Sequence, residues 1–190
     1  IVKGMRVITS ETERLSEMVE ELLDFSRMQN GKFTLTKGNV DILAELGDAV
    51  LIYTEKAKKE GIELVYAEPE NLPAVYGDRN RLRQVFINVI DNAIKYSEKG
   101  GLVTVQAILA DENRIEIEVS DTGCGISPED LPKIKTKFFR ANHNKRGSGI
   151  GLAVADEIIT MHSGTLEVFS EQGMGTTVVI MLPVKQEMKK

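Results

Sequence analysis

The sequence is poor in the side chains that build metal centres and disulfide frameworks. Among 190 residues it has one cysteine, Cys124, and two histidines, His143 and His162. A single cysteine cannot form an internal disulfide, and so few soft ligands nearly exclude a zinc site. The lack of a disulfide framework is typical of a reduced setting, so we expect a cytoplasmic location.

Long apolar runs and a surplus of positive charge are also missing. No run approaches the length needed to cross a bilayer, and the first residues do not resemble a signal peptide. The 29 acidic residues outnumber the 24 basic ones, which gives a net charge of −5 at pH 7. Nucleic-acid-binding domains usually carry a basic surplus, so we expect no nucleic acid as a partner. Any membrane contact would come through segments that this sequence lacks.

What the sequence does contain is ordinary for a globular domain. Hydrophobic residues make up 42% of the chain and charged residues 28%, which leaves enough apolar side chains for a packed core. The length predicts one domain, with at most a small appendage.

Residues 1 to about 30 contain no proline and predict one long amphipathic helix. Its apolar stripe consists of Ile1, Met5, Ile8, Leu15, Met18, Val19, Leu22, Leu23 and Phe25. Asn30-Gly31 is expected to end the helix, because these residue types readily adopt the left-handed conformation found at helix C-termini. Such a helix must bury its stripe, and a second copy of itself is one candidate partner.

The rest of the chain predicts an α/β sandwich, a mixed sheet covered by helices on one face. We expect strands at residues 33–36, 62–66, 74–76, 102–109, 114–120, 165–170 and 176–182. We expect further helices at about 42–60, 79–96 and 150–162, the first two capped by Asp41 and Asp78. Between them lies an irregular segment at 121–149, of a length typical of lids and binding loops.

The helix expected at 79–96 carries four polar residues on one face. Asn92, Lys95 and Tyr96 follow Asn88 at offsets of four, seven and eight residues. Asparagine is a mediocre helix former, so two on one face call for a reason. Amide oxygens suit Mg²⁺, and a nearby lysine suits phosphate. A plain exposed polar face is the alternative.

Two glycine-containing motifs follow. Asp121-Thr122-Gly123-Cys124-Gly125-Ile126 comes directly after an expected strand, so its carboxylate could point into a cleft and accept the exocyclic amine of a purine. An ordinary Asp–Gly turn is the alternative, and Cys124 is expected to be a small spacer. Gly173-Met174-Gly175-Thr176-Thr177 is a turn before the last strand.

Gly147-Ser148-Gly149-Ile150-Gly151-Leu152 opens the last expected helix. Backbone N–H groups at a helix start, approached closely because glycine has no Cβ, form an anion site. The motif is neither a Rossmann fingerprint nor a P-loop, because it follows a loop and has no Gly-Lys-Ser/Thr. Positive charge precedes it and favours phosphate contact. The cations are Lys133, Lys135, Lys137, Arg140, Lys145 and Arg146.

The ordered set of motifs resembles the ATP-binding catalytic domain of bacterial sensor histidine kinases. The set consists of Asn-x-x-x-Asn-Ala-x-Lys-Tyr from Asn88, Asp-x-Gly-x-Gly-Ile from Asp121, Phe138-Phe139, Gly-x-Gly-Ile-Gly-Leu from Gly147 and Gly-x-Gly-Thr from Gly173. The resemblance spans about residues 34–184. It extends to residues 15–27, which look like the second helix of that family's dimerisation and phosphoacceptor hairpin.

The resemblance implies a Bergerat-type ATP-binding fold and a division of the chain. Residues 1–32 would be part of the dimerisation and phosphoacceptor hairpin, 33–186 the catalytic domain and 187–190 a tail. The hairpin implies a homodimer in the full-length protein.

The resemblance also implies roles for residues. Asn88 and Asn92 would hold Mg²⁺ and the ATP phosphates, Lys95 would reach a phosphate, and Tyr96 would flank the nucleotide. Asp121 would accept the adenine amine. The other implied nucleotide contacts are Gly123, Gly125 and Ile126 around the adenine, Gly147, Ser148, Gly149, Gly151 and Leu152 on the phosphate side, and Thr176 near adenine. Arg140, Lys145 and Arg146 are expected at the γ-phosphate, and Phe138 and Phe139 are expected to anchor the irregular segment against the core.

Three other functions are compatible with this fold. Gyrase, heat-shock chaperone and mismatch-repair ATPases hydrolyse ATP, but they have a glutamate general base at the position of Asn88. An asparagine cannot accept a proton at neutral pH, so Asn88 favours phosphoryl transfer. A serine kinase of the anti-sigma type shares the fold, but the helix at 1–30 counts against it. A dimerising scaffold without nucleotide is disfavoured because every Mg²⁺ and adenine position is filled.

The implied activity is transfer of the ATP γ-phosphate to a histidine and then to an aspartate of a response-regulator protein. The family's acceptor histidine lies on the first hairpin helix, and neither His143 nor His162 matches it. The chain also begins at Ile1 rather than methionine. We therefore expect a fragment that starts downstream of the acceptor, binds ATP or ADP, and does not phosphorylate itself.

Overall fold

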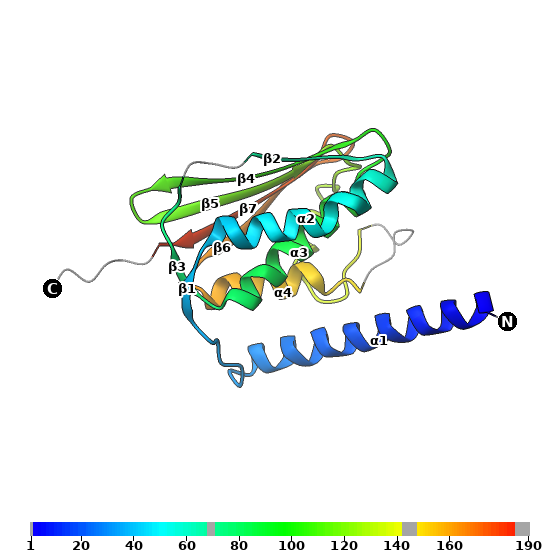
Figure 1. The fold of residues 1–190 in the computed structure, drawn as a ribbon, viewed down its shortest axis with the longest axis horizontal. Coiled ribbons are helices and arrows are strands. Elements are labelled where there is room, and N and C mark those ends of the chain that lie inside the picture. The colour runs from blue at the N-terminus through cyan, green and yellow to red at the C-terminus, as the bar shows by residue number, and fades with distance from the viewer. Residues whose placement is uncertain (1, 68–70, 142–147, 185–190) are drawn as a thin grey trace.

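The structure is a computed structural model that describes residues 2–67, 71–141 and 148–184, including the side chains of helix α1 at Thr12, Leu15, Ser16, Met18–Glu20 and from Leu22 onward (Figure 1). The helices are α1 (Val2–Gln29), α2 (Ile42–Glu60), α3 (Arg79–Tyr96) and α4 (Gly151–Met161). The strands are β1 (Gly38–Val40), β2 (Glu63–Ala67), β3 (Val75–Gly77), β4 (Leu102–Asp111), β5 (Arg114–Asp121), β6 (Thr165–Glu171) and β7 (Gly175–Pro183).

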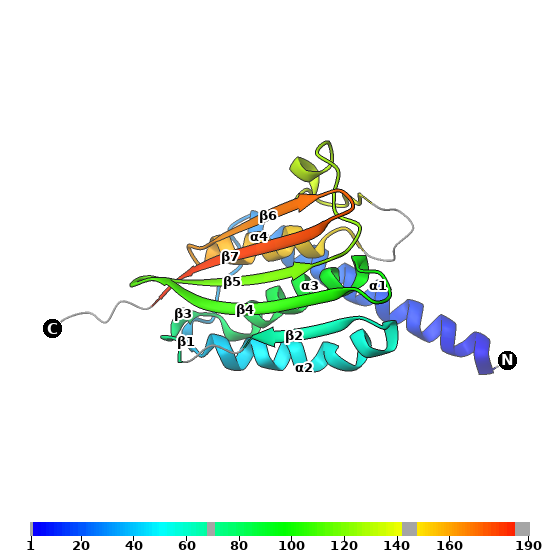
Figure 2. The same cartoon turned by 90° about the horizontal axis from the view of Figure 1, so that it is seen from above.

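The main sheet has the strand order β2-β4-β5-β7-β6. Only the β2–β4 pair is parallel among these described strands, so the sheet is mixed. Helices α2, α3 and α4 cover one face, and Figure 2 shows the other face of the sheet from above. The predicted α/β sandwich, a mixed sheet with helices on one face, is therefore confirmed.

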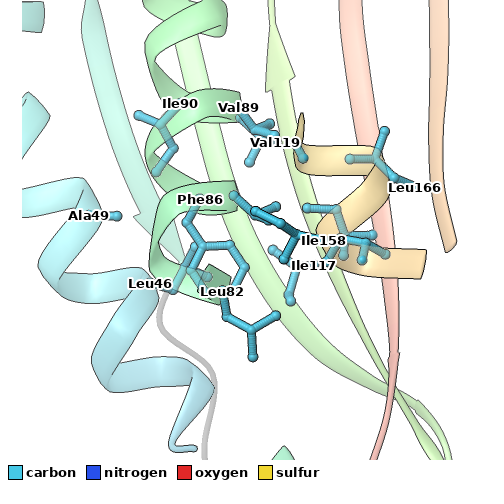
Figure 3. Close-up of a cluster of buried hydrophobic side chains, with 14 of the residues drawn as sticks. Leu46, Ala49, Leu82, Phe86, Val89, Ile90, Ile117, Val119, Ile158 and Leu166 are labelled. Atoms are coloured by element: carbon cyan, nitrogen blue, oxygen red, sulfur yellow. The ribbon is translucent and has the colours of Figure 1, made fainter. Parts of the chain in front are cut away.

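The core lies between the sheet and the helices (Figure 3). Strands β4 and β5 bury alternate residues, as in Val103 and Val105 or Ile115 and Ile117, and leave the residues between them half-buried. Helix α3 supplies Phe86, which is 1% exposed, together with the other apolar residues on its inner face. The polar motif of α3 therefore lies on the side of the helix that is not used for the core.

Side-chain caps fix where two of the helices begin. The Asp41 carboxylate accepts a hydrogen bond from the Ala44 N–H (3.2 Å), and the Asp78 carboxylate accepts from the N–H groups of Asn80 (3.1 Å) and Arg81 (3.2 Å). Both caps were predicted and are confirmed. Helix α2 ends at Gly61, which adopts φ 72°.

The predicted strand at 33–36 is wrong. The Thr36 N–H donates to the Asp78 carboxylate (2.8 Å), and the Arg81 guanidinium lies 4.6 Å from the centre of the Phe33 ring. These residues thus pack on the start of α3 instead of pairing in a sheet. Two residues later, at Gly38, β1 begins, and it pairs antiparallel with β3 in a separate small sheet.

Helix α1 turns two apolar faces in different directions. Phe25 and Met28 are 4% and 5% exposed and belong to the core, and α1 packs on α4 (Figure 1). The second face is open, with Leu15, Val19, Leu22 and Leu23 between 36% and 56% exposed. Among the described residues, no helix has both the length and the low charge needed to cross a bilayer.

Candidate functional site

A cavity of about 400 Å³ opens between the outer face of α3, the ends of β5 and β7, the irregular segment and the start of α4. Its lining contains most of the residues that the motifs singled out. These are Asn88, Asn92, Lys95, Tyr96, Asp121, Gly125, Ile126, Arg140, Ser148, Gly149, Gly151, Leu152 and Thr176. Segments far apart in the sequence thus meet at one site.

Of the predicted site residues that the structure describes, one is not part of this lining. Gly123 is buried just behind the cavity wall, beside the carbonyl of Tyr96. Lys145, Arg146 and Gly147 lie outside the described residues, and so do His143 and the tail at 187–190.

The polar face of α3 meets the start of α4. The Asn88 side-chain N–H donates to the Gly151 carbonyl (3.1 Å), and a Cβ on Gly151 would lie 3.6 Å from the Asn88 side chain. Asn92 lies one turn further along α3 and also lines the cavity. Two amide groups of one helix therefore line the same wall.

Asp121, at the end of β5, also lines the cavity. It is 8% exposed and accepts a hydrogen bond from the Gly123 N–H (2.8 Å). Burial raises the pKa of Asp121 above its ordinary value of 3.8, while backbone N–H groups of Gly123 and Thr176 counteract the rise. The side chain is thus a buried acceptor, held in a fixed orientation by backbone donors.

Glycines allow the backbone segments around Asp121 to approach one another. A Cβ on Gly123 would overlap the carbonyl of Tyr96. Gly125 has φ 64°, and a Cβ there would overlap the carbonyl of Glu171. The glycine spacing of the motif therefore reflects two close backbone contacts as well as a turn.

The start of α4 has the features of an anion site. Ile150 precedes the helix and provides no side-chain cap for its first N–H groups. The Ser148 hydroxyl accepts from the Ile150 N–H (3.2 Å), and Gly149 adopts φ 72°. Ser148, Gly149 and Gly151 all line the cavity, so the positive end of the helix is close to it.

In the described part of the irregular segment, most of the predicted cations are engaged away from the cavity. Lys133 pairs with Asp130 (3.7 Å), Lys135 pairs with Asp156 (2.9 Å), and Lys137 lies 4.6 Å from the centre of the Phe25 ring. Of the cations predicted in this segment that the structure describes, Arg140 is the one that lines the cavity.

The expected anchoring by the Phe138-Phe139 pair is wrong for its first member. Phe138 is 58% exposed and adopts φ 61°, while Phe139 is half-buried and lines the cavity. The Phe138 N–H donates to the Gly149 carbonyl (2.9 Å). The backbone of Phe138, not its ring, therefore ties the irregular segment to the start of α4.

Electrostatics at the end of α3 involve three neighbours. Burial raises the pKa of Tyr96 above its ordinary value of 10.0, and the positive charge of Arg140 opposes the rise. The Lys95 ammonium lies 4.9 Å from the centre of the Tyr96 ring. The site therefore combines a neutral phenol with two cations.

Several lining residues were not singled out as site residues from the sequence. Val119, Val168 and Val178 alternate along strands in the same way as core residues, so the sequence marks them only as buried. Asp91 lies between the two motif asparagines and is a hard ligand that the sequence could have indicated. The sequence around Met18 does not indicate that this residue lines the cavity, because its position there depends on how α1 packs.

His162 has a structural role. Its Nε2 accepts from the Asp78 N–H (2.9 Å), and its Nδ1 donates to the Ile158 carbonyl (2.7 Å). Burial lowers the pKa of His162 below its ordinary value of 6.5. The ring is thus a neutral, 4% exposed bridge between α4 and the start of α3. Its two nitrogens are both engaged in these hydrogen bonds.

Comparison with known proteins identifies the family. Residues 77–186 match the family model described as histidine kinase-, DNA gyrase B-, and HSP90-like ATPase. The chain is 36% identical over 177 residues, 91% of its length, to the sensor-like histidine kinase SenX3 of Mycobacterium tuberculosis. It is 32% identical over 192 residues, 97% of its length, to histidine kinase P4 of Formosa agariphila. The resemblance carried by the motifs is confirmed.

The chain spans 43% of SenX3 and 14% of P4, less than half the length of either relative. Among solved structures it is similar to full-length ShkA in complex with AMPPNP, with a TM-score of 0.83 and 29% identity. That similarity covers 94% of this chain and 37% of ShkA. Over most of its length, the chain therefore shares its fold with part of that structure.

Proposed function

The chain belongs to the histidine kinase-, DNA gyrase B-, and HSP90-like ATPase family, and from this premise we propose that it is the ATP-binding catalytic portion of a sensor histidine kinase. The observation that carries the proposal is the convergence of Asn88, Asn92 and Asp121 on one cavity. An adenine amine would donate to the Asp121 carboxylate, and the phosphates would lie between the two asparagines and the start of α4. The cavity is therefore interpreted as an ATP site with a base end and a phosphate end.

The donor set fits Mg²⁺. The described residues contain no cluster of three or more His, Cys, Asp and Glu that could hold a metal alone. Asn88 and Asn92 present amide oxygens, which are hard ligands, and Mg²⁺ usually keeps waters and shares its coordination with substrate phosphates. When bound, Mg²⁺ neutralises phosphate charge. The side-chain nitrogen of Asn88 is the atom engaged with Gly151, so its oxygen is the atom we assign to the metal.

The residues at the phosphate end act by position and charge. The N–H groups at the start of α4 would donate to phosphate oxygens, and Lys95 and Arg140 would supply positive charge. In the transfer, the bond from the γ-phosphorus to the bridging oxygen breaks and a bond to an imidazole nitrogen forms, leaving ADP. The protein carries out little covalent chemistry of its own in such a reaction, so its main contribution is to position the reacting groups.

The side chain at position 88 separates kinase from hydrolase. An ATPase of this fold would need a base there to take a proton from water, and the amide of Asn88 has no basic group at neutral pH. Phosphoryl transfer to a histidine is therefore favoured over rapid hydrolysis. A response-regulator protein would receive the phosphoryl group on an aspartate, and the exposed face of α1 (Leu15, Val19, Leu22 and Leu23) would pair with a second copy.

The test joins the chain to the acceptor-bearing hairpin helix of a histidine kinase and supplies γ-labelled ATP. We expect acid-labile, alkali-stable phosphate on the protein, and much less of it on the matched Asp121→Asn protein at the same subsaturating ATP concentration. Acid-stable label would support a serine kinase, and release of inorganic phosphate without labelled protein would support a hydrolase. Either result would overturn the proposal.

A further inference from the structure

Helix α1 reaches the cavity, and among its described side chains Met18 is the one that belongs to the lining. Met18 lines it together with Asn88 and Arg140, although α1 lies outside the α/β sandwich (Figure 1). Met18 is half-buried, whereas its neighbours Leu15 and Val19 are 56% and 53% exposed. The helix therefore turns one face to the cavity and another to its surroundings.

Contacts further along the same face hold α1 in this position. Phe25 lies two turns after Met18 and is buried, and the Lys137 ammonium of the irregular segment lies 4.6 Å from the centre of its ring. The Arg81 guanidinium of α3 donates to the Asp24 carboxylate (2.7 Å), and both side chains are about a quarter exposed, at 25% and 24%. Met18 is thus presented by a helix that is attached both to α3 and to the irregular segment.

We propose that Met18 is a nucleotide-binding residue and that bound nucleotide and docked α1 stabilise each other. This inference rests on the proposed function of the cavity. A methionine side chain is flexible and polarisable, so it can pack against a ligand that enters beside it. Because coupling between two equilibria is reciprocal, a helix whose docking completes the cavity wall must itself dock more firmly when the cavity is filled. The docked face and the exposed apolar face belong to the same helix, α1. Nucleotide binding would therefore stabilise the helix that also carries the exposed apolar residues.

The first test compares Met18→Ala with Ser16→Ala in the 190-residue chain, titrated calorimetrically with ADP and Mg²⁺. Ser16 is the matched control because it lies two residues before Met18 on the same helix and is exposed. Partial loss of a methionine contact predicts about five-fold weaker binding for Met18→Ala, and Ser16→Ala should bind as the unaltered chain does. Melting temperatures without ADP check that both variants are folded.

The second test measures amide hydrogen exchange of residues 22–29 with and without saturating ADP. We expect slower exchange with ADP in the unaltered chain and a smaller effect in Met18→Ala. Equal affinities of the two variants, or unchanged exchange while ADP binds, would overturn the inference and leave the proposed function standing. If the unaltered, folded chain binds no ADP, both fail.

Discussion

Asp121 and Thr176 lie directly opposite each other where β5 pairs with β7, and the backbone N–H of Thr176 helps to lower the pKa of the Asp121 carboxylate against the larger, raising effect of burial. Thr176 also contacts Ser170, with 2.9 Å between the two hydroxyl oxygens, and Ser170 accepts from the Ile126 N–H (2.9 Å). The last two strands and the motif after β5 are therefore joined around one buried carboxylate. The Gly-x-Gly-Thr turn belongs to the site because it brings Thr176 to this position.

Asp121→Asn should weaken ADP binding and stabilise the nucleotide-free chain. Loss of a charge-assisted hydrogen bond to the adenine amine predicts a decrease in affinity of about ten- to one-hundred-fold. The folded-state pKa of Asp121 is raised, so its contribution to stability is present at acid pH and lost as pH rises through that pKa. At neutral pH the ionised carboxylate thus costs stability, and removing its charge should raise the melting temperature by roughly 2 °C.

The control for this substitution is Asp111→Asn, because Asp111 is exposed in the β4–β5 turn and far from the cavity lining. It should leave ADP affinity unchanged in the same calorimetric titration. An Asp121→Asn chain that binds ADP as well as the Asp111→Asn chain does would contradict the assigned role of Asp121.

Because His162 is buried and neutral, we expect the folded chain to lose stability in mild acid. Its folded-state pKa is lowered, so its contribution is present above the unfolded value of about 6.5 and lost as pH falls from there through the folded pKa. Urea midpoints measured from pH 8 to pH 5 should fall for the unaltered chain. His162→Gln should be less stable at pH 8 but should show a flatter decrease. Parallel curves for the two proteins would refute this role.

Asn88→Ala should remove the effect of Mg²⁺ on ATP binding, because the variant lacks one of the two amide oxygens assigned to the metal. Titrations with and without Mg²⁺ should give nearly equal ATP affinities in this variant, whereas Asp121→Asn should still bind ATP more tightly with Mg²⁺ than without. The two substitutions therefore separate the metal end of the site from the base end. An undiminished Mg²⁺ effect in Asn88→Ala would count against the metal assignment.

Gly125→Ala and Gly173→Ala form a matched pair. Both glycines have positive φ, at 64° and 82°, but a Cβ on Gly125 would overlap the Glu171 carbonyl, while a Cβ on Gly173 has nothing within 4 Å. Backbone strain alone predicts a loss of about 1–2 kcal/mol for Gly173→Ala. Overpacking adds about 1–3 kcal/mol for Gly125→Ala. Chemical denaturation measures both, and equal losses would show that the close contact does not matter.

The sequence predicts the parts of the molecule that local rules determine. The polar face of α3 follows from helical periodicity, and the caps at Asp41 and Asp78 follow from residue type. Prediction from the sequence fails where a contact with a residue far along the chain determines the local structure. Thr36 lies in an alternating stretch, but its N–H is taken by Asp78, 42 residues away.

The same limit applies at the site. The two adjacent phenylalanines of one motif lie in different environments: Phe139 lines the cavity, whereas Phe138 is exposed and has a positive φ. Neither the sequence nor the motif indicates which ring turns inward, because the turn before α4 sets this. Met18 depends on the packing of a separate helix and could not be predicted from its neighbours.

The central claim is that the cavity binds an adenine nucleotide with Mg²⁺. Calorimetric titration of the 190-residue chain with ADP, with and without Mg²⁺, tests it most directly. The account predicts one site per chain and tighter binding with Mg²⁺. A chain that is folded by circular dichroism and binds no ADP in either condition would contradict the claim, and a dimerising scaffold without nucleotide would then be the better description.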